Sequence, residues 1–374
     1  MSNIEILKST ICLNMIVKNE AHIIKRCLES VKPHIHSWVI ADTGSTDGTQ
    51  SLIREIMQDV PGELIEREWV NFGHNRDEVL QHSNGKSDYI LNIDADEWLE
   101  FEDEIGFKNL NADSYYIIKD QGNKHYWVRN IIKNDMGWKW HGVLHEYLQC
   151  QDSETYGDLN HVVIQARQEG ARAKDPDTYR KDAAILTKAL IDEPQNTRYQ
   201  FYLAQSLRDA KDYEAAILHY KRRIEMDGWD EEIFYSKYQI AILMERLDHP
   251  WEECLNAYLT AWEHTPERAE PLYRIGSYYL ENKNWPLAWL FLNQAANLKR
   301  KEEFLLFIEE QIYEYMALFD ATVAAGNLGY WEEMEERHEK LLQIKNLDED
   351  NRSLAIQNYE YFQSIKAEMK KAVA

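Results

Sequence analysis

Residues 11–31 read ICLNMIVKNEAHIIKRCLESV, an apolar run followed by a helical stripe. The run 11–17 has the length and the continuous apolar character of a buried strand. After the polar residues 18–20, apolar side chains return at helical spacing, which predicts a helix over 23–31. Asn19 is its predicted N-cap. A strand followed directly by a helix is the unit from which α/β sheets are built.

The same alternation continues along the first half of the chain. Further short apolar runs predict strands at 38–41, 64–68, 89–93, 115–119 and 126–132. A second apolar stripe, at Leu52, Ile53 and Ile56, predicts a helix between two of them. This pattern predicts a mainly parallel sheet with helices on its faces. In such sheets ligands bind at the carboxyl ends of the strands.

The pattern changes at residues 165–176, QARQEGARAKDP, which we interpret as a hinge between two domains, 1–170 and 171–374. Beyond it, pairs of apolar and small residues recur with a period close to the ~34 residues of tetratricopeptide-type hairpins. The recurring positions are Leu203-Ala204, Ile240-Ala241, Ile275-Gly276, and Tyr213, Trp251 and Trp285 with the small residues Ala216, Cys254 and Ala288. We expect stacked helical hairpins, continued by helices from residue 301 and closed by a charged helix over 351–371.

Composition limits the function. The 374 residues carry a net charge of −23, which disfavours sequence-independent binding of nucleic acid, because that binding needs Lys and Arg to neutralise phosphates. The four cysteines show no CxxC spacing, which fits a reducing compartment. The N-terminus MSNIEILKST lacks the features of a signal peptide, and no apolar run has the roughly 20 residues of a membrane helix. We therefore expect a cytoplasmic protein.

The stretch YILNIDADEW, residues 89–98, carries the strongest sign of chemistry. Its predicted strand ends in Asp94 and Asp96, and side chains two positions apart in extended chain point to the same side. By strand rise they lie roughly 7 Å apart. Two carboxylates at that spacing suit one Mg²⁺ or Mn²⁺ ion bound to a diphosphate. A solvated acidic turn is the simpler alternative.

Three other stretches contribute polar residues to the predicted site. Asn19 and Glu20 follow the first strand. Asp42 ends the second strand, before the turn TGSTDGT, where it either accepts a hydrogen bond from a nucleobase N–H or caps a helix. Arg76, in FGHNRDEVL, lies at a helix entry and can pair with a carboxylate, a base or a phosphate. A surface ion pair is the alternative for Arg76.

Taken together, these pieces resemble the family 2 glycosyltransferases, which have the GT-A fold with a Rossmann-like, mainly parallel sheet. The matching pieces are MIVKNE with IIKRCLESV, DTGSTDGT, residues 72–76 and NIDADE, in the family's order. The helical half resembles the tetratricopeptide extension of a subset of this family. That subset includes enzymes similar to the peptide S-glycosyltransferases of bacteriocin pathways, and WKWHGVLHEYL, residues 138–148, is similar to it as well.

The resemblance implies a donor site and a metal site. In the donor site, Asp42 and Arg76 would contact the nucleobase, and Asp94 would contact ribose or metal. The full set of donor-site residues is Val17, Asn19, Glu20, Asp42, Arg76, Asp94 and Ala95. Asp94, Asp96 and His145 would hold the metal. The alternative for His145 is a histidine buried in a hydrogen-bonded loop. One residue departs from the family pattern: Asp77 follows the arginine where the family usually has Asn, and an ionised acid accepts but cannot donate.

Family 2 enzymes invert the anomeric centre by a single displacement, which needs a general base for the acceptor. Glu146 is the first candidate, and His141 and Asp135 are its rivals. If residues 145 and 146 lie in a strand, their side chains face opposite sides and only one can face the site. Trp138 and Trp140 either form a wall of the sugar or acceptor pocket or belong to the core.

We therefore predict a metal-dependent inverting glycosyltransferase that uses Mn²⁺ or Mg²⁺ and a nucleotide-sugar, with a UDP-sugar favoured. The helical repeats favour a peptide or protein acceptor, or a protein partner that delivers one, over a lipid-linked or polysaccharide precursor. Assembly of several copies of the chain stays open. The alternatives are a catalytically silent nucleotide-binding scaffold for protein partners and a nucleotidyltransferase on a similar sheet.

Overall fold

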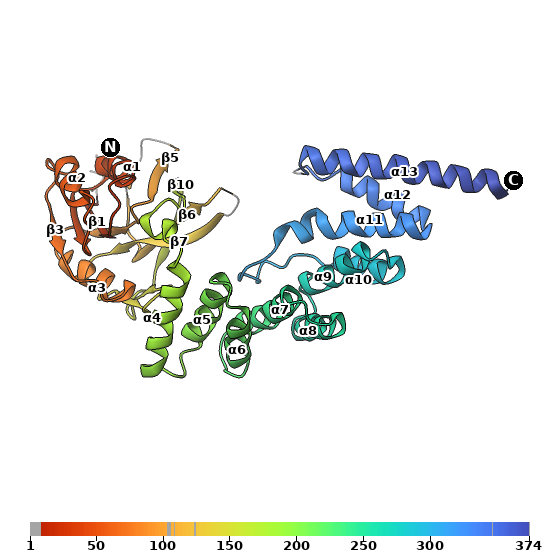
Figure 1. The fold of residues 1–374 in the computed structure, drawn as a ribbon. Helices are drawn as coiled ribbons and strands as arrows, with labels where there is room; N and C mark the ends of the chain where they lie inside the picture. Colours follow the sequence, from red (N-terminus) through yellow and green to blue (C-terminus); the bar gives the residue numbers. More distant parts are fainter. Residues whose placement is uncertain (1–8, 103–105, 108, 123–124, 346, 374) are drawn as a thin grey trace. The chain divides into compact units, whose positions relative to one another are not determined.

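The computed structural model describes residues 9–102, 106–107, 109–122, 125–345 and 347–373 (Figure 1). The chain forms two compact units, Met1–Pro194 and Gln195–Ala374. Helix α4, Thr178–Asp192, lies in the first unit. The domain boundary at residue 170 stays a prediction. Among the described residues, no helix has the length and apolar character needed to cross a membrane.

The first unit is built on an eight-stranded sheet with the order β3-β2-β1-β4-β7-β6-β10-β5. Its strands are β1 (Ile11–Val17), β2 (Ser37–Asp42), β3 (Gly62–Glu66), β4 (Tyr89–Asn92), β5 (Glu97–Phe101), β6 (Ser114–Asp120), β7 (His125–Lys133) and β10 (Tyr156–Ala166). β3, β2, β1 and β4 run parallel, as does the pair β6 and β10. β7 is antiparallel to β4 and β6, and β5 is antiparallel to β10. The predicted mainly parallel α/β sheet is confirmed.

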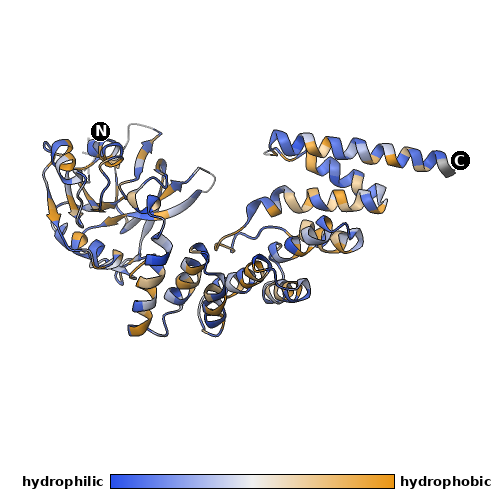
Figure 2. Cartoon of the chain, viewed as in Figure 1, coloured by the Kyte–Doolittle hydropathy of each residue, from blue (hydrophilic) through white to orange (hydrophobic). Residues whose placement is uncertain are grey.

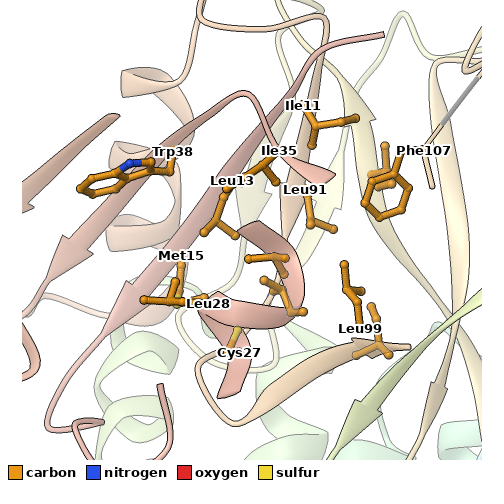
Figure 3. Close-up of a cluster of buried hydrophobic side chains, with 14 of the residues drawn as sticks. Ile11, Leu13, Met15, Cys27, Leu28, Ile35, Trp38, Leu91, Leu99 and Phe107 are labelled. Atoms are coloured by element: carbon orange, nitrogen blue, oxygen red, sulfur yellow. The ribbon is translucent and has the colours of Figure 1, made fainter. Parts of the chain in front are cut away.

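Helices α1 (Ile24–Val31), α2 (Thr49–Ile56) and α3 (Phe72–His82) connect the parallel strands. Strand β1 has the predicted bounds, and its side chains are buried on both faces, which explains its continuous apolar run. Figure 3 shows one of these faces, where Leu13 and Met15 lie near Cys27 and Leu28 of α1.

The predicted N-cap at Asn19 is wrong. Helix α1 begins after Ile23, which makes no side-chain cap. Asn19 instead adopts a left-handed backbone with φ 58°, and its Oδ1 accepts a hydrogen bond from the Thr46 N–H at 2.8 Å. Asn favours such turns as readily as caps, because its short side chain bonds nearby backbone. Asn19 therefore joins two loops at the sheet edge.

The sheet must curl to connect β4 with β5. These strands follow one another in sequence but stand four strand spacings apart in the order, about 19 Å in a flat sheet. The five steps from Asn92 to Glu97 reach at most about 18 Å when fully extended. They are not extended, because the Glu97 N–H donates to the Asp94 carbonyl at 3.1 Å. The half of the sheet from β4 to β5 therefore curves back towards its own centre.

The segment interpreted as a hinge is largely structured. Strand β10 continues to Ala166, and a short 3₁₀ helix, η2 (Ala171–Lys174), precedes α4. Strands β5 and β10 and the small hairpin of β8 (Lys139–His141) and β9 (Tyr147–Gln149) were not predicted.

The second unit is helical. Its elements are α5 (Thr197–Asp209), α6 (Tyr213–Ile224), α7 (Asp230–Arg246), α8 (Trp251–His264), α9 (Glu270–Glu281), α10 (Trp285–Asn297), the π-helix η3 (Ile312–Met316), α11 (Ala317–Leu328), α12 (Trp331–Leu342) and α13 (Glu349–Val373). Apolar residues form stripes along these helices (Figure 2). The predicted helical hairpins are confirmed. The helix expected from residue 301 is not present, because residues 298–309 form turns and irregular chain; the last predicted helix corresponds to α13.

Small residues sit where the paired helices touch. Ala204, Ala216, Ala241 and Ala288 are fully buried. At Gly276 an added Cβ would lie 2.5 Å from Cγ of Leu292, so no larger residue fits without movement of α10. These contacts explain the recurrence of small residues in the sequence.

Candidate active site

The carboxyl ends of β1, β2 and β4 meet at one edge of the sheet. Val17, the last residue of β1, pairs in register with Asp42, the last residue of β2. The Val17 carbonyl accepts hydrogen bonds from the Thr43 N–H at 2.9 Å and the Thr43 hydroxyl at 3.0 Å. Asp94 follows the end of β4 by two residues. The edge predicted to bind ligand thus gathers polar groups from three strands.

Asp42 is buried, with 1% of its surface exposed. Its Oδ1 accepts hydrogen bonds from the backbone N–H groups of Gly44 and Ser45, at 3.0 and 2.8 Å, and from the Gln50 amide at 3.0 Å. Its Oδ2 is buried and has no partner among the described residues. A buried carboxylate oxygen without a donor is costly. One oxygen therefore shapes the turn, and the other is suited to an N–H donor of a ligand.

Arg76, on α3, lies between two carboxylates. Its Nη2 donates to Oδ1 of Asp94 at 2.6 Å, and its Nε donates to Oε1 of Glu146 at 2.7 Å. Burial alone would lower the pKa of Arg76, but the two negative charges outweigh it and raise that pKa. Burial likewise opposes ionisation of Asp94, and the charge of Arg76 overcomes it and lowers the pKa of that carboxyl. Contact of Arg76 with a nucleobase stays a prediction.

A second pair of carboxylates, Glu20 and Asp96, meets at the start of η2. The Ala171 N–H lies 3.2 Å from both carboxylate oxygens of Glu20, and the Gly170 N–H bonds Asp96. Burial, together with the charge of Asp96, raises the pKa of Glu20 to about 7. Burial and the charge of Asp94 raise the pKa of Asp96. Negative charge is therefore concentrated at this rim of the site, which we define as the carboxylates of Glu20, Asp94 and Asp96.

Gly170 and Ala171 were missed as site residues. A Cβ on Gly170 would lie 3.3 Å from a carboxylate oxygen of Asp96 and 3.3 Å from one of Glu20. Glycine permits this close approach of backbone to the two acids. The only signal in the sequence is a pair of small residues, in a segment that its polarity assigns to a hinge.

The carboxylates fit a divalent cation. Asp94 and Asp96 offer the oxygen ligands that Mg²⁺ and Mn²⁺ prefer. Burial and, after it, the charge of Asp94 raise the pKa of Asp96, and a bound cation would relieve the repulsion between the two carboxylates. The described part of the chain has no group of three His, Cys, Asp or Glu side chains suited to a metal, so His145 is not assembled with the two aspartates. Mg²⁺ commonly uses one or two carboxylates and completes its shell with phosphate oxygens and water.

The β8–β9 hairpin carries the candidate bases. His145 is an exposed turn residue with φ 54°, so residues 145 and 146 are not in a strand. Glu146 points inward to Arg76, and its side chain is 11% exposed. His141 is exposed, and its ring stacks on Tyr147 with centroids 5.6 Å apart. Of these residues, Glu146 faces the acids of the sheet edge.

Asp135, the third candidate base, lies at the opposite edge of the sheet. Its Oδ1 accepts a hydrogen bond from the Gly85 N–H at 3.1 Å, in the turn that precedes β4. The neighbouring Lys133 pairs with Tyr89, the first residue of β4. Asp135 therefore stabilises a turn far from the carboxyl ends of the strands.

Asp77 and Trp140 lie where α3 meets β8, whereas Trp138 lies in the core. Oδ1 of Asp77 accepts a hydrogen bond from the Trp140 N–H at 2.6 Å and so ties α3 to β8. The Trp140 ring lies 5.1 Å from the Arg76 guanidinium. Trp138 is buried in the core. The acid that departs from the family pattern thus positions the hairpin that carries Glu146.

A cavity of about 370 Å³ opens inside the curled half of the sheet. Strands β4, β6, β7 and β9 contribute to its wall, together with α3 and the β8–β9 hairpin. Charged and aromatic side chains line it: Arg76, Asp94, Lys119, Arg129, Trp140 and Glu146. Lys119 pairs with Glu97 at the same wall. Asp94 and Glu146 therefore face one space large enough for a sugar-sized group.

The side chains of the two predicted donor-site residues Val17 and Ala95 are buried, so these residues can contact a donor only through their backbone. Val17 is buried at the end of β1, and the Ala95 methyl group packs in the core between the two acids. Asn19 and Glu20 lie in the loop beyond β1, where the N–H of Asn19 donates to the Ser45 hydroxyl at 2.8 Å. The structure brings these residues to the predicted edge, and their roles stay predictions.

Comparison with known proteins agrees with this geometry. Residues 12–162 match the model of glycosyl transferase family 2. The SPbeta prophage-derived glycosyltransferase SunS of Bacillus subtilis is 26% identical over 230 residues, covering 58% of this chain and 53% of SunS. The chain thus spans about half the length of that relative.

Two further proteins are similar to this chain. A TPR repeat-containing protein of Synechococcus elongatus is 36% identical over 93 residues, 25% of this chain and 22% of that protein. The crystal structure of S. aureus TarS residues 1–349 in complex with UDP-GlcNAc covers 68% of this chain and 90% of its own, with 15% identity and a TM-score of 0.38.

The family suggested by the motifs is confirmed by the match over residues 12–162. The helices that follow form hairpins with small residues at their contacts. Residues 12–162 are therefore a family 2 glycosyltransferase domain, and the chain extends it with tetratricopeptide-like helical hairpins.

Proposed function

We propose that the protein transfers a sugar from a nucleotide-sugar, with inversion at the anomeric carbon, and that UDP carries the sugar. The observation that carries the proposal is the buried Oδ2 of Asp42 at the sheet edge, which has no hydrogen-bond partner in the part of the chain that the structure describes. The imide N–H of uracil is a donor of the kind this oxygen lacks. The match of the domain to glycosyl transferase family 2 supports the same reaction class.

In this proposal the donor diphosphate lies beside Asp94 and Asp96. These two carboxylates would hold Mg²⁺ or Mn²⁺, which neutralises the charge of the leaving diphosphate when it is bound. Val17, Asn19, Glu20 and Ala95 border the nucleotide through backbone and loop groups.

Glu146 is the proposed general base. An acceptor in the 370 Å³ cavity would attack the anomeric carbon of the sugar. The bond to the nucleotide breaks, its electron pair leaves with the diphosphate, and the acceptor proton passes to Glu146. Arg76 holds Glu146 at 2.7 Å and so orients it. His141 is a weaker candidate, because its ring is exposed and stacks on Tyr147.

We propose that the acceptor is a peptide or protein, or reaches the enzyme through a protein partner. The helical unit contains a cavity of about 530 Å³ lined by side chains of both charges, among them Arg208, Glu245, Arg274 and Glu309. Charged and hydrogen-bonding groups of both kinds suit a peptide, whose backbone both donates and accepts. Stacked helical hairpins commonly offer such surfaces to partners.

A donor panel tests the proposal. The purified chain is titrated calorimetrically with UDP in Mg²⁺ or Mn²⁺, then incubated with UDP-sugars and candidate peptide acceptors. We expect UDP binding, release of UDP and a mass gain of one sugar on the acceptor. Binding of UDP with no turnover of any donor would favour a silent scaffold instead. Pyrophosphate release from UTP and a sugar phosphate would show a nucleotidyltransferase.

A further inference from the structure

The cavity inside the curled sheet contains several polar atoms that lack partners. Nε of Arg129, Nε1 of Trp140, Nδ2 of Asn92 and Oδ1 of Asn130 are buried and unpartnered within the described residues. All four side chains belong to residues that line the cavity. Asn92 and Asn130 are 4% and 7% exposed. Buried polar groups normally have hydrogen-bond partners. Three of these four atoms are donors and one, Oδ1 of Asn130, is an acceptor, so the cavity suits a ligand with more acceptor than donor atoms.

An irregularity in β7 produces this arrangement. Tyr115 pairs with Ile131 but Tyr116 pairs with Arg129, so Asn130 is an extra residue in the strand. Neighbours in a regular strand face opposite sides, whereas such a bulge re-aims side chains. As a result Arg129 and Asn130 both line the cavity. Bulges of this kind are common beside active sites.

Arg129 is also a cation without an acidic partner. Its Nη2 donates to the Tyr116 hydroxyl at 2.7 Å and its Nη1 to the Leu148 carbonyl at 3.4 Å, both neutral groups. The cavity's other cations are paired: Arg76 with Asp94 and Glu146, and Lys119 with Glu97. Within the described part of the chain, Arg129 forms no ion pair, so its charge is available to a ligand.

We propose that this cavity binds a carboxylate or phosphate group of a substrate, with Arg129 as its counter-ion. The inference rests on the proposed transferase function, because it assigns an anionic substrate to the same site. Guanidinium groups bind planar carboxylates and phosphates in preference to neutral sugars. The indole N–H of Trp140 and the amide of Asn92 supply further donors. The anion is either an acidic sugar on the donor or an acidic group on the acceptor.

Binding of simple anions tests the proposal. The full chain is saturated with UDP and Mg²⁺, so that the diphosphate site is filled, and titrated with glucuronate, glucose 6-phosphate and glucose. We expect the two anions to bind at least roughly ten-fold more tightly than glucose, as one charge-assisted hydrogen bond would give. Equal affinity for the three compounds, or competition of the anions with UDP, would overturn the proposal.

Two variants show whether the charge of Arg129 is responsible. Arg129→Met removes the charge. Asn92→Asp places a negative charge in the cavity and removes no hydrogen bond of Nδ2, because this atom has no partner among the described residues. Both should lose the preference for anions. Arg54→Met, at an exposed side chain of α2, makes the same charge change outside the cavity and should retain the preference for anions. If Arg129→Met and Asn92→Asp bind anions as the unmodified chain does, the proposal fails.

Two readouts separate this inference from the proposed function. If the unmodified chain neither binds UDP nor turns over a donor, the proposed transferase function is wrong. The preference for anions is a separate measurement, which tests only the role of Arg129. UDP-glucuronic acid and UDP-glucose then identify the source of the anion. If the donor carries the anion, Arg129→Met weakens the binding of UDP-glucuronic acid and leaves the binding of UDP-glucose unchanged. If the acceptor carries the anion, the variant binds both donors as the unmodified chain does, but it no longer binds glucuronate.

Discussion

Replacement of Glu20 by glutamine should stabilise the protein at alkaline pH and leave it unchanged in acid. The pKa of Glu20 rises from 4.5 to about 7 in the folded chain, because the side chain is buried beside Asp96. Below pH 4.5 the carboxyl is protonated in both the folded and the unfolded chain. As pH rises to 7, only the unfolded chain ionises freely, so the folded state loses stability. Above pH 7 the penalty is complete.

The magnitude follows from the same values. Each pKa unit corresponds to about 1.4 kcal/mol, so the full penalty for the rise from 4.5 to about 7 is at most about 3.5 kcal/mol. Glu20 is only partly buried, which reduces the expected gain to about 1–2 kcal/mol at pH 8. A glutamine oxygen can still accept the Ala171 N–H, so the contact with η2 is retained.

Urea unfolding in a chelating buffer at pH 4 and pH 8 measures the effect. Glu29→Gln, on an exposed side chain of α1, is the matched control. Addition of Mg²⁺ at pH 8 should stabilise the unmodified chain more than the Glu20→Gln variant, because a cation relieves the same repulsion. A variant no more stable than the unmodified chain at pH 8, or equally stabilised at both pH values, would refute this account of the rim.

Other perturbations follow from contacts described above. Asp94→Asn or Asp96→Asn should lower donor turnover by roughly 100-fold, measured as released nucleotide, because a metal-ligating charge is lost. Asp42→Asn keeps the oxygen that shapes its turn but presents an amide at the buried position, so calorimetry should show UDP binding weakened by roughly ten-fold. Gly276→Leu drives a side chain into Leu292, where a Cβ already comes within 2.5 Å, and should destabilise the helical unit by about 1–3 kcal/mol in urea unfolding.

The parts of the fold that local pattern determines could be predicted from the sequence. Strand β1 was located to the residue because both its faces are buried, and the helical hairpins because close contacts require small residues at a fixed period. Strand β10 was missed, because YGDLNHVVIQA mixes polar and apolar residues at no single period. The five residues of β5 were also missed, directly after the acidic turn.

From the sequence, only those site residues could be predicted that lie at the ends of strands. Asp42 and Asp94 lie at the expected edge because the carboxyl ends of parallel strands converge there. The hydrogen bond from Arg76 to Glu146 depends on where the β8–β9 hairpin packs. The extra residue at Asn130 depends on the register between two strands. Neither property is encoded in a short stretch of sequence, because both arise from pairing between distant segments.

The curled sheet affects how the domain formed by residues 12–162 can diversify. The cavity wall next to Asp94 consists largely of hydrogen-bonded strands, whose pairing fixes the positions of Tyr116 and Arg129. Loops accept insertions and change shape at low cost, whereas a strand in mid-sheet cannot lengthen without disrupting its neighbours. New substrate preferences should therefore evolve here through exchange of single side chains on a constant backbone, a property that favours redesign by point substitution.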